Sequence, residues 1–273
     1  MKKILSVLLC LMCLVGCAAP AVELGGVAAT TAPVYGFACA IAEGTDVAVT
    51  QVVTDTVSCL HDYALSVRQM EDVTRSEQIL ISGLGLEAFM EEALSQEKTI
   101  DLSVGVKTLD EDPHYWLDPD CAAVMAENIC LALSSRYPVY AEKFRTNTDA
   151  LVVKFQELKA WGKAELQDIS CREIVTFHDG FSYLADGFDL EILAAVEVEA
   201  GSEPSAADLT KIVELVQRGS LPCVFTEKNG SDKAALVIAA ETGCAVYALD
   251  MAMSGDWFEA MEHNINTLKE ALT

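Results

Sequence analysis

The helical segment in the middle of the chain restricts the fold more than any other feature. Residues 141–169, AEKFRTNTDALVVKFQELKAWGKAELQDI, contain no proline and a single glycine. Apolar residues recur on one face of a helix, at Phe144, Leu151, Phe155 and Leu158. We therefore expect one helix of about 30 residues and about 45 Å, which is long enough to run from one lobe to another. The alternative is two shorter helices that are broken near Gly162.

Apolar runs alternate with helical patterns on both sides of this segment. The expected strands before it are 47–53 and 79–82, and those after it are 173–177, 195–198, 223–227 and 245–250. This alternation is typical of an α/β fold with parallel strands, and 273 residues are enough for two lobes. The glycines of SGLGLE at 82–87 suggest a dinucleotide-binding loop, but the third glycine and the downstream acid are missing, so we expect a turn.

The N-terminal residues have the pattern of a secretory signal. Residues 1–17, MKKILSVLLCLMCLVGC, carry two lysines and then an apolar run of about a dozen residues, too short for a transmembrane helix. The last four, Leu14 to Cys17, resemble the bacterial lipobox, in which the chain is cut before the cysteine and its thiol is acylated. We therefore expect an extracytoplasmic protein that is lipid-anchored to the cell membrane through Cys17, with residues 18–26 as a tether. The alternative is a buried cysteine in a plain signal peptide.

Charge and cysteine content exclude two classes of protein. The formal net charge of −24 at pH 7 makes nucleic acid an unsuitable partner. Outside the signal segment the cysteines are odd in number, scattered and without a CxxC pair, at Cys39, Cys59, Cys121, Cys130, Cys171, Cys223 and Cys244. Such a set is no disulfide framework, and we interpret these residues as small buried hydrophobic side chains.

Three of the four histidines and one aspartate follow predicted strands or lie in turns. His178 comes directly after strand 173–177, and Asp250 follows the apolar run AVYAL. His61 lies in the loop after strand 47–53, and His114 lies in the turn-rich EDPHYWLDPD at 111–120. Loops at the carboxyl ends of parallel strands converge on one crevice, so these four side chains could face one cleft. Three imidazoles and a carboxylate suit tetrahedral Zn²⁺; the alternative is three unrelated loop histidines.

Several acidic residues near these histidines are candidates for supporting roles. A histidine ligand needs an acceptor for its second ring nitrogen, and the nearby candidates are Asp62, Asp112, Asp118 and Asp179. We interpret Asp112 with Pro113 as the turn that carries His114, and Asp118 as its acceptor. Glu227 ends another predicted strand and is the alternative fourth ligand.

These residues lie in motifs that resemble a known family, the metal-binding lipoproteins of bacterial zinc and manganese ABC importers. The motifs occur in the family's order, as HDY (61–63), GLGLEAF (83–89), DPHYWLDP (112–119), FHDGFSYL (177–184), EPSAADL (203–209), FTE (225–227) and ETGCAVYALD (241–250). DPHYWLDP is the most specific of them, and the resemblance runs from about residue 27 to the end.

The resemblance implies two Rossmann-like α/β lobes joined by a single long helix, with a metal site in the interlobe cleft. It places the N-terminal lobe at 27–138, the linking helix at 139–170 and the C-terminal lobe at 171–273. Carried over position by position, the family's ligands fall on His61, His114, His178 and Asp250. The implied protein is a monomeric receptor, not an enzyme, that passes its metal to an ABC permease.

The third ligand bears on the choice of metal. It is a histidine in members similar to zinc binders and a glutamate in many manganese binders, and here it is His178, so Zn²⁺ is expected before Mn²⁺ or Fe²⁺. Many zinc members carry a histidine-rich loop between the first two ligands, but residues 92–111 contain no histidine. A second class of function, a zinc-dependent hydrolase, would use the same donors with an open water site, yet the chain has no HExxH motif and no nucleophile elbow.

Overall fold

The computed structural model describes residues 25–55, 60, 63–109, 112–197 and 204–273. The expected signal segment with Cys17, most of the expected tether, and the candidate residues Cys59, His61 and Asp62 lie outside the described residues. Within the part of the chain that is described, no helix is long and apolar enough to cross a membrane.

The N-terminal lobe is built on a parallel sheet with the strand order β2-β1-β3-β4. Its strands are β1 (Gly25–Ala29), β2 (Val49–Gln51), β3 (Ser76–Ile81) and β4 (Thr99–Asp101). Its helical elements are α1 (Ala32–Ala42), α2 (Val67–Arg75), η1 (Leu86–Ala93), η2 (Tyr115–Leu117) and α3 (Pro119–Arg136). Strands β2 and β3 match predicted strands, whereas β1 and β4 were not predicted, and β1 begins inside the expected tether.

The C-terminal lobe repeats this plan with the parallel order β6-β5-β7-β8. Its strands are β5 (Glu173–His178), β6 (Glu191–Glu197), β7 (Cys223–Glu227) and β8 (Ala245–Leu249). Its helices are α5 (Ser182–Gly187), α6 (Ala206–Gly219), α7 (Lys233–Thr242) and α8 (Trp257–Leu272). In both sheets the first strand lies between the second and the third. The predicted pair of α/β lobes is therefore confirmed, and each sheet has the switch in strand order beside which ligands bind in such folds.

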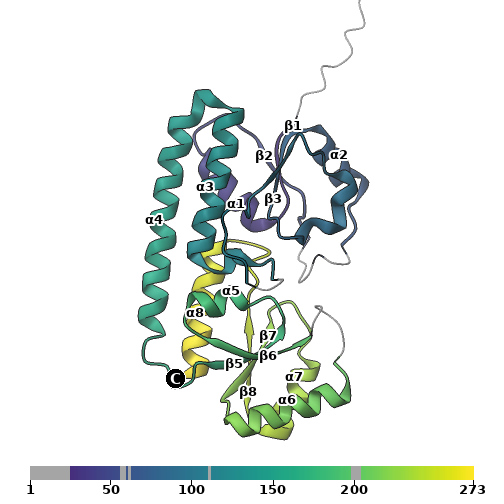
Figure 1. Ribbon diagram of the computed structural model, residues 1–273, viewed down its shortest axis with the longest axis vertical. Coiled ribbons are helices and arrows are strands. Elements are labelled where there is room, and N and C mark those ends of the chain that lie inside the picture. The colour runs from purple at the N-terminus through teal and green to yellow at the C-terminus, as the bar shows by residue number, and fades with distance from the viewer. Residues whose placement is uncertain (1–24, 56–59, 61–62, 110–111, 198–203) are drawn as a thin grey trace, which may run out of the picture.

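One continuous helix, α4 (Ala141–Glu165), runs alongside both lobes (Figure 1). It contains 25 residues and is therefore about 37 Å long. This is shorter than the predicted span of 139–170, because Pro138–Tyr140 forms a separate 3-10 turn, η3, and the helix ends before Leu166. The four residues of its predicted apolar face, Phe144, Leu151, Phe155 and Leu158, are all buried.

Gly162 lies inside α4, so the alternative of two helices broken at this position is wrong. A Cβ atom at Gly162 would collide with the ring of Phe188 and would come within 2.7 Å of Ile265 Cδ1. Glycine is needed there because the C-terminal lobe packs directly on the helix backbone. This contact explains why the chain accepts the helix-weakening effect of a glycine.

One hydrophobic core cluster extends through α4 and into both lobes, and each lobe also has a smaller cluster of its own. Two buried tryptophans connect the lobes within it. Trp116 Nε1, on η2, donates to the carbonyl of Met251 at 2.9 Å, and Trp257 Nε1, on α8, donates to the carbonyl of Trp116 at 3.0 Å. The Trp257 ring also packs edge-on against Phe155 of α4, with ring centroids 5.0 Å apart. The lobes therefore share packing and hydrogen bonds, not only a linking helix.

The predicted turn at SGLGLE is confirmed, since Gly83, Leu84 and Gly85 all have positive φ angles. The turn places Glu87 inside the N-terminal lobe, where its carboxylate accepts hydrogen bonds from Thr30 Oγ1 at 2.6 Å and from the Ser82 amide at 2.7 Å. Burial raises the pKa of Glu87 although these bonds oppose the rise. Glu87 thereby joins the carboxyl ends of β1 and β3, which are the ends that face the other lobe.

The described cysteines are unbridged, at Cys39, Cys121, Cys130, Cys171, Cys223 and Cys244. Burial raises the pKa of Cys223 to about 12 and that of Cys121 to about 12. Thiols with such values carry little thiolate at neutral pH. Cys130 and Cys223 are buried as expected, whereas the expectation is wrong for four partly exposed cysteines, Cys39, Cys121, Cys171 and Cys244.

Candidate metal centre

Two histidines from different lobes face each other between the sheets. His114 directly precedes η2 and is 4% exposed, and His178 is the last residue of β5 and is 3% exposed. Their ring centroids are 5.2 Å apart and the rings are inclined at 77°. The predicted convergence of these two histidines is what the structure shows. Both imidazoles are shielded from water, and their nitrogens are suitable donors for a borderline divalent metal.

Asp112 fixes the orientation of the His114 ring. Its Oδ1 lies 2.7 Å from His114 Nδ1 and accepts the His114 amide at 2.8 Å, while its Oδ2 accepts the Ser182 amide of α5 at 3.0 Å. Burial opposes ionisation of Asp112, but the hydrogen bonds from the His114 ring and from the two amides outweigh it and lower the pKa of this carboxyl. A carboxylate at Nδ1 favours the tautomer with the proton there, which leaves Nε2 of His114 to bind a metal.

The acceptor beside His114 is thus Asp112, and the expectation for Asp118 has to be corrected. Asp118 caps α3, where its Oδ1 accepts the amide of Asp120 at 3.0 Å, and it forms an ion pair with Lys159 of the linking helix. The physical reason is local. Asp118 precedes a proline at the first position of a helix, so its carboxylate turns to the free amides of the first turn.

Gly180 leaves the space in which the two rings meet. A Cβ atom at this position would lie 2.6 Å from His178 Nε2 and 2.8 Å from His114 Nδ1, so no other residue fits without moving an imidazole. Trp116 and Phe181 form aromatic walls, with centroids 5.3 Å from His114 and 6.5 Å from His178. The sequence analysis did not single out Gly180. A glycine two residues after a histidine at a strand end could have indicated a close approach to that ring.

The two candidate carboxylates of the C-terminal lobe lie at the predicted strand ends. Asp250 follows β8 and is 5% exposed, and Glu227 is the last residue of β7 and is 8% exposed. Asp250 Oδ1 accepts the Ala252 amide at 2.8 Å, and Oδ2 accepts Lys228 Nζ at 2.8 Å. Among the residues that the structure describes, no three His, Cys, Asp or Glu side chains are grouped closely enough to hold a metal ion. Of the predicted ligands, the structure therefore brings together His114 and His178.

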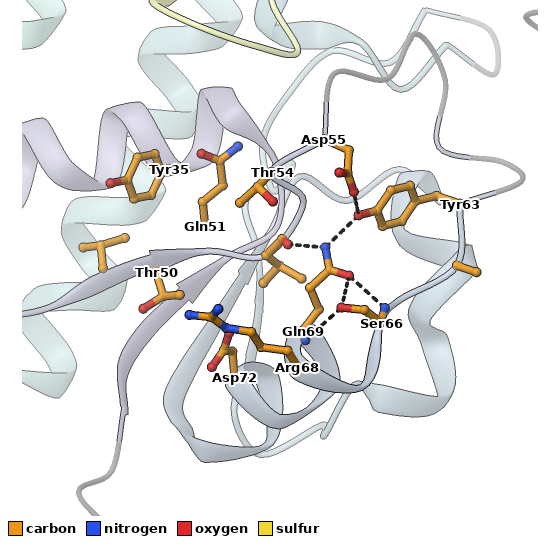
Figure 2. A pocket seen from close by; sticks show the side chains of 13 residues that line it. Tyr35, Thr50, Gln51, Thr54, Asp55, Tyr63, Ser66, Arg68, Gln69 and Asp72 are labelled. Atoms are coloured by element: carbon orange, nitrogen blue, oxygen red, sulfur yellow. Dashed lines mark hydrogen bonds between the residues drawn. The ribbon is translucent and has the colours of Figure 1, made fainter.

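The first predicted ligand in chain order, His61, lies outside the described residues, but hydrogen bonds connect the chain on either side of it. Tyr63 Oη donates to Asp55 Oδ2 at 2.5 Å, and Gln69 Nε2 of α2 donates to Tyr63 Oη at 2.6 Å and to the Val52 carbonyl at 2.8 Å (Figure 2). These residues line a pocket of about 730 Å³ beside the end of β2. Neither of the two facing histidines lines this pocket, so it is separate from their meeting point.

Comparison with known proteins agrees with this architecture. Residues 27–271 match the family described as "Zinc-uptake complex component A periplasmic". The chain belongs to this family. The family consists of receptors for metal uptake and not of enzymes, so the alternative of a zinc-dependent hydrolase is set aside.

Individual relatives show which kinds of protein are similar to this chain. The zinc-binding protein AdcA of Streptococcus pyogenes serotype M3 is 30% identical over 200 residues, which are 70% of this chain and 39% of AdcA. The iron-binding protein YfeA of Yersinia pestis is 27% identical over 212 residues, which are 72% of this chain and 68% of YfeA. The chain therefore spans about two fifths of the length of the AdcA relatives that it matches.

Solved structures give the same result for the fold. The crystal structure of ZnuA superimposes with a TM-score of 0.81 and 27% sequence identity, over 90% of this chain and 98% of that one. This chain and ZnuA therefore share one fold.

Proposed function

We propose that this protein captures a divalent transition metal outside the cytoplasm, with Zn²⁺ as its principal cargo, and delivers it to an ABC permease. The observation that carries the proposal is the meeting of His114 and His178, one from each lobe, in a shielded position. Membership in a zinc-uptake family and similarity to a zinc-binding protein support it. A site between two lobes can enclose its cargo and release it when local contacts change.

The proposed ligands are His61, His114, His178 and Asp250, with Glu227 as the alternative fourth donor. Three neutral imidazoles and one carboxylate match the preference of Zn²⁺ for nitrogen donors and four-fold coordination. Mn²⁺ and Fe²⁺ are the alternative cargoes, and similarity to the iron-binding protein YfeA is the observation that favours iron.

We further propose that the mature protein is a monomer held at the outer face of the cell membrane by lipid on Cys17. The lipobox-like sequence before this cysteine supports the anchor, and the related AdcA of Streptococcus pneumoniae is named a lipoprotein. Fractionation of cells that express a Cys17→Ser variant checks the anchor, because that variant should leave the membrane fraction.

The direct test of the proposed function is metal binding by the purified chain without residues 1–17. We expect about one Zn²⁺ per chain by equilibrium dialysis with elemental analysis, and we expect Zn²⁺ to displace both Mn²⁺ and Fe²⁺ in competition, as the order of metal affinities for nitrogen donors requires. Failure to retain any of the three metals would refute the proposal. If the chain retains Fe²⁺ or Mn²⁺ against equimolar Zn²⁺, it is still a metal receptor, but that metal and not Zn²⁺ is its principal cargo.

A change of Asp112 to asparagine tests how the site is held. The variant Asp112→Asn should bind zinc about 10- to 100-fold more weakly, because it loses the carboxylate that orients and polarises the His114 ring. Asp168→Asn is the matched control, since it removes the same charge from an exposed position after α4. Competition with a chromogenic chelator measures both affinities, and equal values for the two variants would contradict the assigned role of Asp112.

A further inference from the structure

Asp250 is held at its backbone and at one of its two carboxylate oxygens. Its backbone is fixed by Asn264 of α8, which accepts the Asp250 amide at 2.7 Å and donates to the Asp250 carbonyl at 2.8 Å. Oδ1 accepts the Ala252 amide at 2.8 Å. The side chain is only 7% exposed, so this carboxylate has a fixed direction and is largely removed from water.

The ammonium group of Lys228 contacts the other carboxylate oxygen of Asp250, Oδ2. Lys228 Nζ lies 2.8 Å from Asp250 Oδ2, and the Lys228 amide donates to the Leu249 carbonyl at 2.8 Å, which places the two residues side by side at the ends of β7 and β8. The two partners differ in their surroundings, since the Lys228 side chain is 54% exposed. The ammonium can therefore withdraw into water without moving the backbone, whereas the carboxylate cannot follow it.

We propose that Lys228 is a built-in competitor of the cargo at Asp250. This inference rests on the proposed function, in which Asp250 is a metal ligand. A metal that binds Oδ2 competes with the ammonium, because two cations held at one carboxylate oxygen repel each other. When the cargo leaves, the ammonium returns and compensates a buried negative charge that would otherwise disfavour the empty site. Lys228 thereby weakens metal binding and speeds release.

The variant Lys228→Met removes the ammonium and keeps the length of the side chain. Because the lysine is half-exposed and its ion pair is screened, we expect a modest effect, about three- to tenfold tighter zinc binding. Most of the gain should appear as slower transfer of zinc to an excess of chelator. The variant Lys228→Arg should restore the wild-type values. Lys233→Met, which removes the same charge from an exposed site at the start of α7, should leave both quantities unchanged.

A double-mutant cycle separates competition at Asp250 from a general effect of charge. In an Asp250→Asn background, Lys228→Met should no longer tighten binding, because the competed carboxylate is gone. Equal affinities for Lys228→Met and Lys233→Met, or weaker binding by Lys228→Met, would overturn the inference. The proposed function fails in a different way, namely if the wild-type chain binds no metal. An unchanged affinity of the Asp250→Asn variant alone would keep the receptor, make Glu227 its fourth ligand and overturn the inference.

Discussion

Replacement of both His114 and His178 by alanine is expected to weaken zinc binding by more than about a hundredfold, since the hydrogen-bond partners behind a ligand alone are worth about 10- to 100-fold. The two rings lie 5.2 Å apart and come from different lobes, so their loss removes donors from both sides of the site. The affinity is measured by competition with a chelator of known zinc affinity.

The control for this double variant is His263→Ala, because His263 is exposed on α8 and far along the chain from both of these histidines. It should keep the wild-type affinity. Thermal unfolding without metal shows whether the double variant is still folded, which matters because both rings are buried. If the folded double variant binds zinc with an affinity within threefold of the wild type, these histidines are not zinc ligands.

The change Trp116→Ala is expected to lower the free energy of unfolding by about 3–5 kcal/mol, the usual range for truncation of a large buried aromatic residue. Trp116 is completely buried, and its side chain and carbonyl both form hydrogen bonds to the C-terminal lobe. Urea unfolding of the chain without metal measures the change. We also expect the variant to lose zinc affinity, since His114 lies two residues away and its ring packs edge-on against the indole.

The variant Trp116→Phe keeps most of the apolar volume but removes the donor to the Met251 carbonyl. It should cost about 1–3 kcal/mol, the range for a buried group that loses its partner. Trp161→Phe, at a partly exposed position on α4, is the matched control and should change stability little. If Trp116→Phe were no more harmful than this control, the hydrogen bond between the lobes would have no part in stability.

The sequence was informative about the fold where a strand contains a clear apolar segment. In the C-terminal lobe, the first three residues of CVFTE and all of AVYAL are apolar, and β7 and β8 lie within a residue of the predicted ends. Strands β1 and β4 were missed for compositional reasons. GGVAA has too many glycine and alanine residues to stand out as a strand, and TID is too short for an alternating pattern.

The proposed metal ligands could be predicted from the sequence, whereas the residues that orient them could be predicted less well. His178 and Asp250 could be placed because strand ends converge in parallel sheets. Which aspartate supports His114 could not be read from proximity, since Asp112 and Asp118 flank the same histidine. Backbone geometry decides it: Asp112 accepts the amide of His114 itself, whereas the proline after Asp118 commits that residue to a helix cap. The contact of Lys228 with Asp250 joins two strands and has no signal in either segment alone.

The core shared by the lobes limits which conformations are populated. Separation of the lobes as rigid bodies would return the indoles of Trp116 and Trp257 to water, and each such ring buries about 150–250 Å². At about 25 cal/mol per Å², the penalty is on the order of 4–6 kcal/mol for each ring. A difference of about 5.5 kcal/mol already corresponds to a population ratio of about ten thousand. We therefore expect the cargo to enter and leave through fast, local rearrangements at the strand ends, while the lobes keep one mutual orientation.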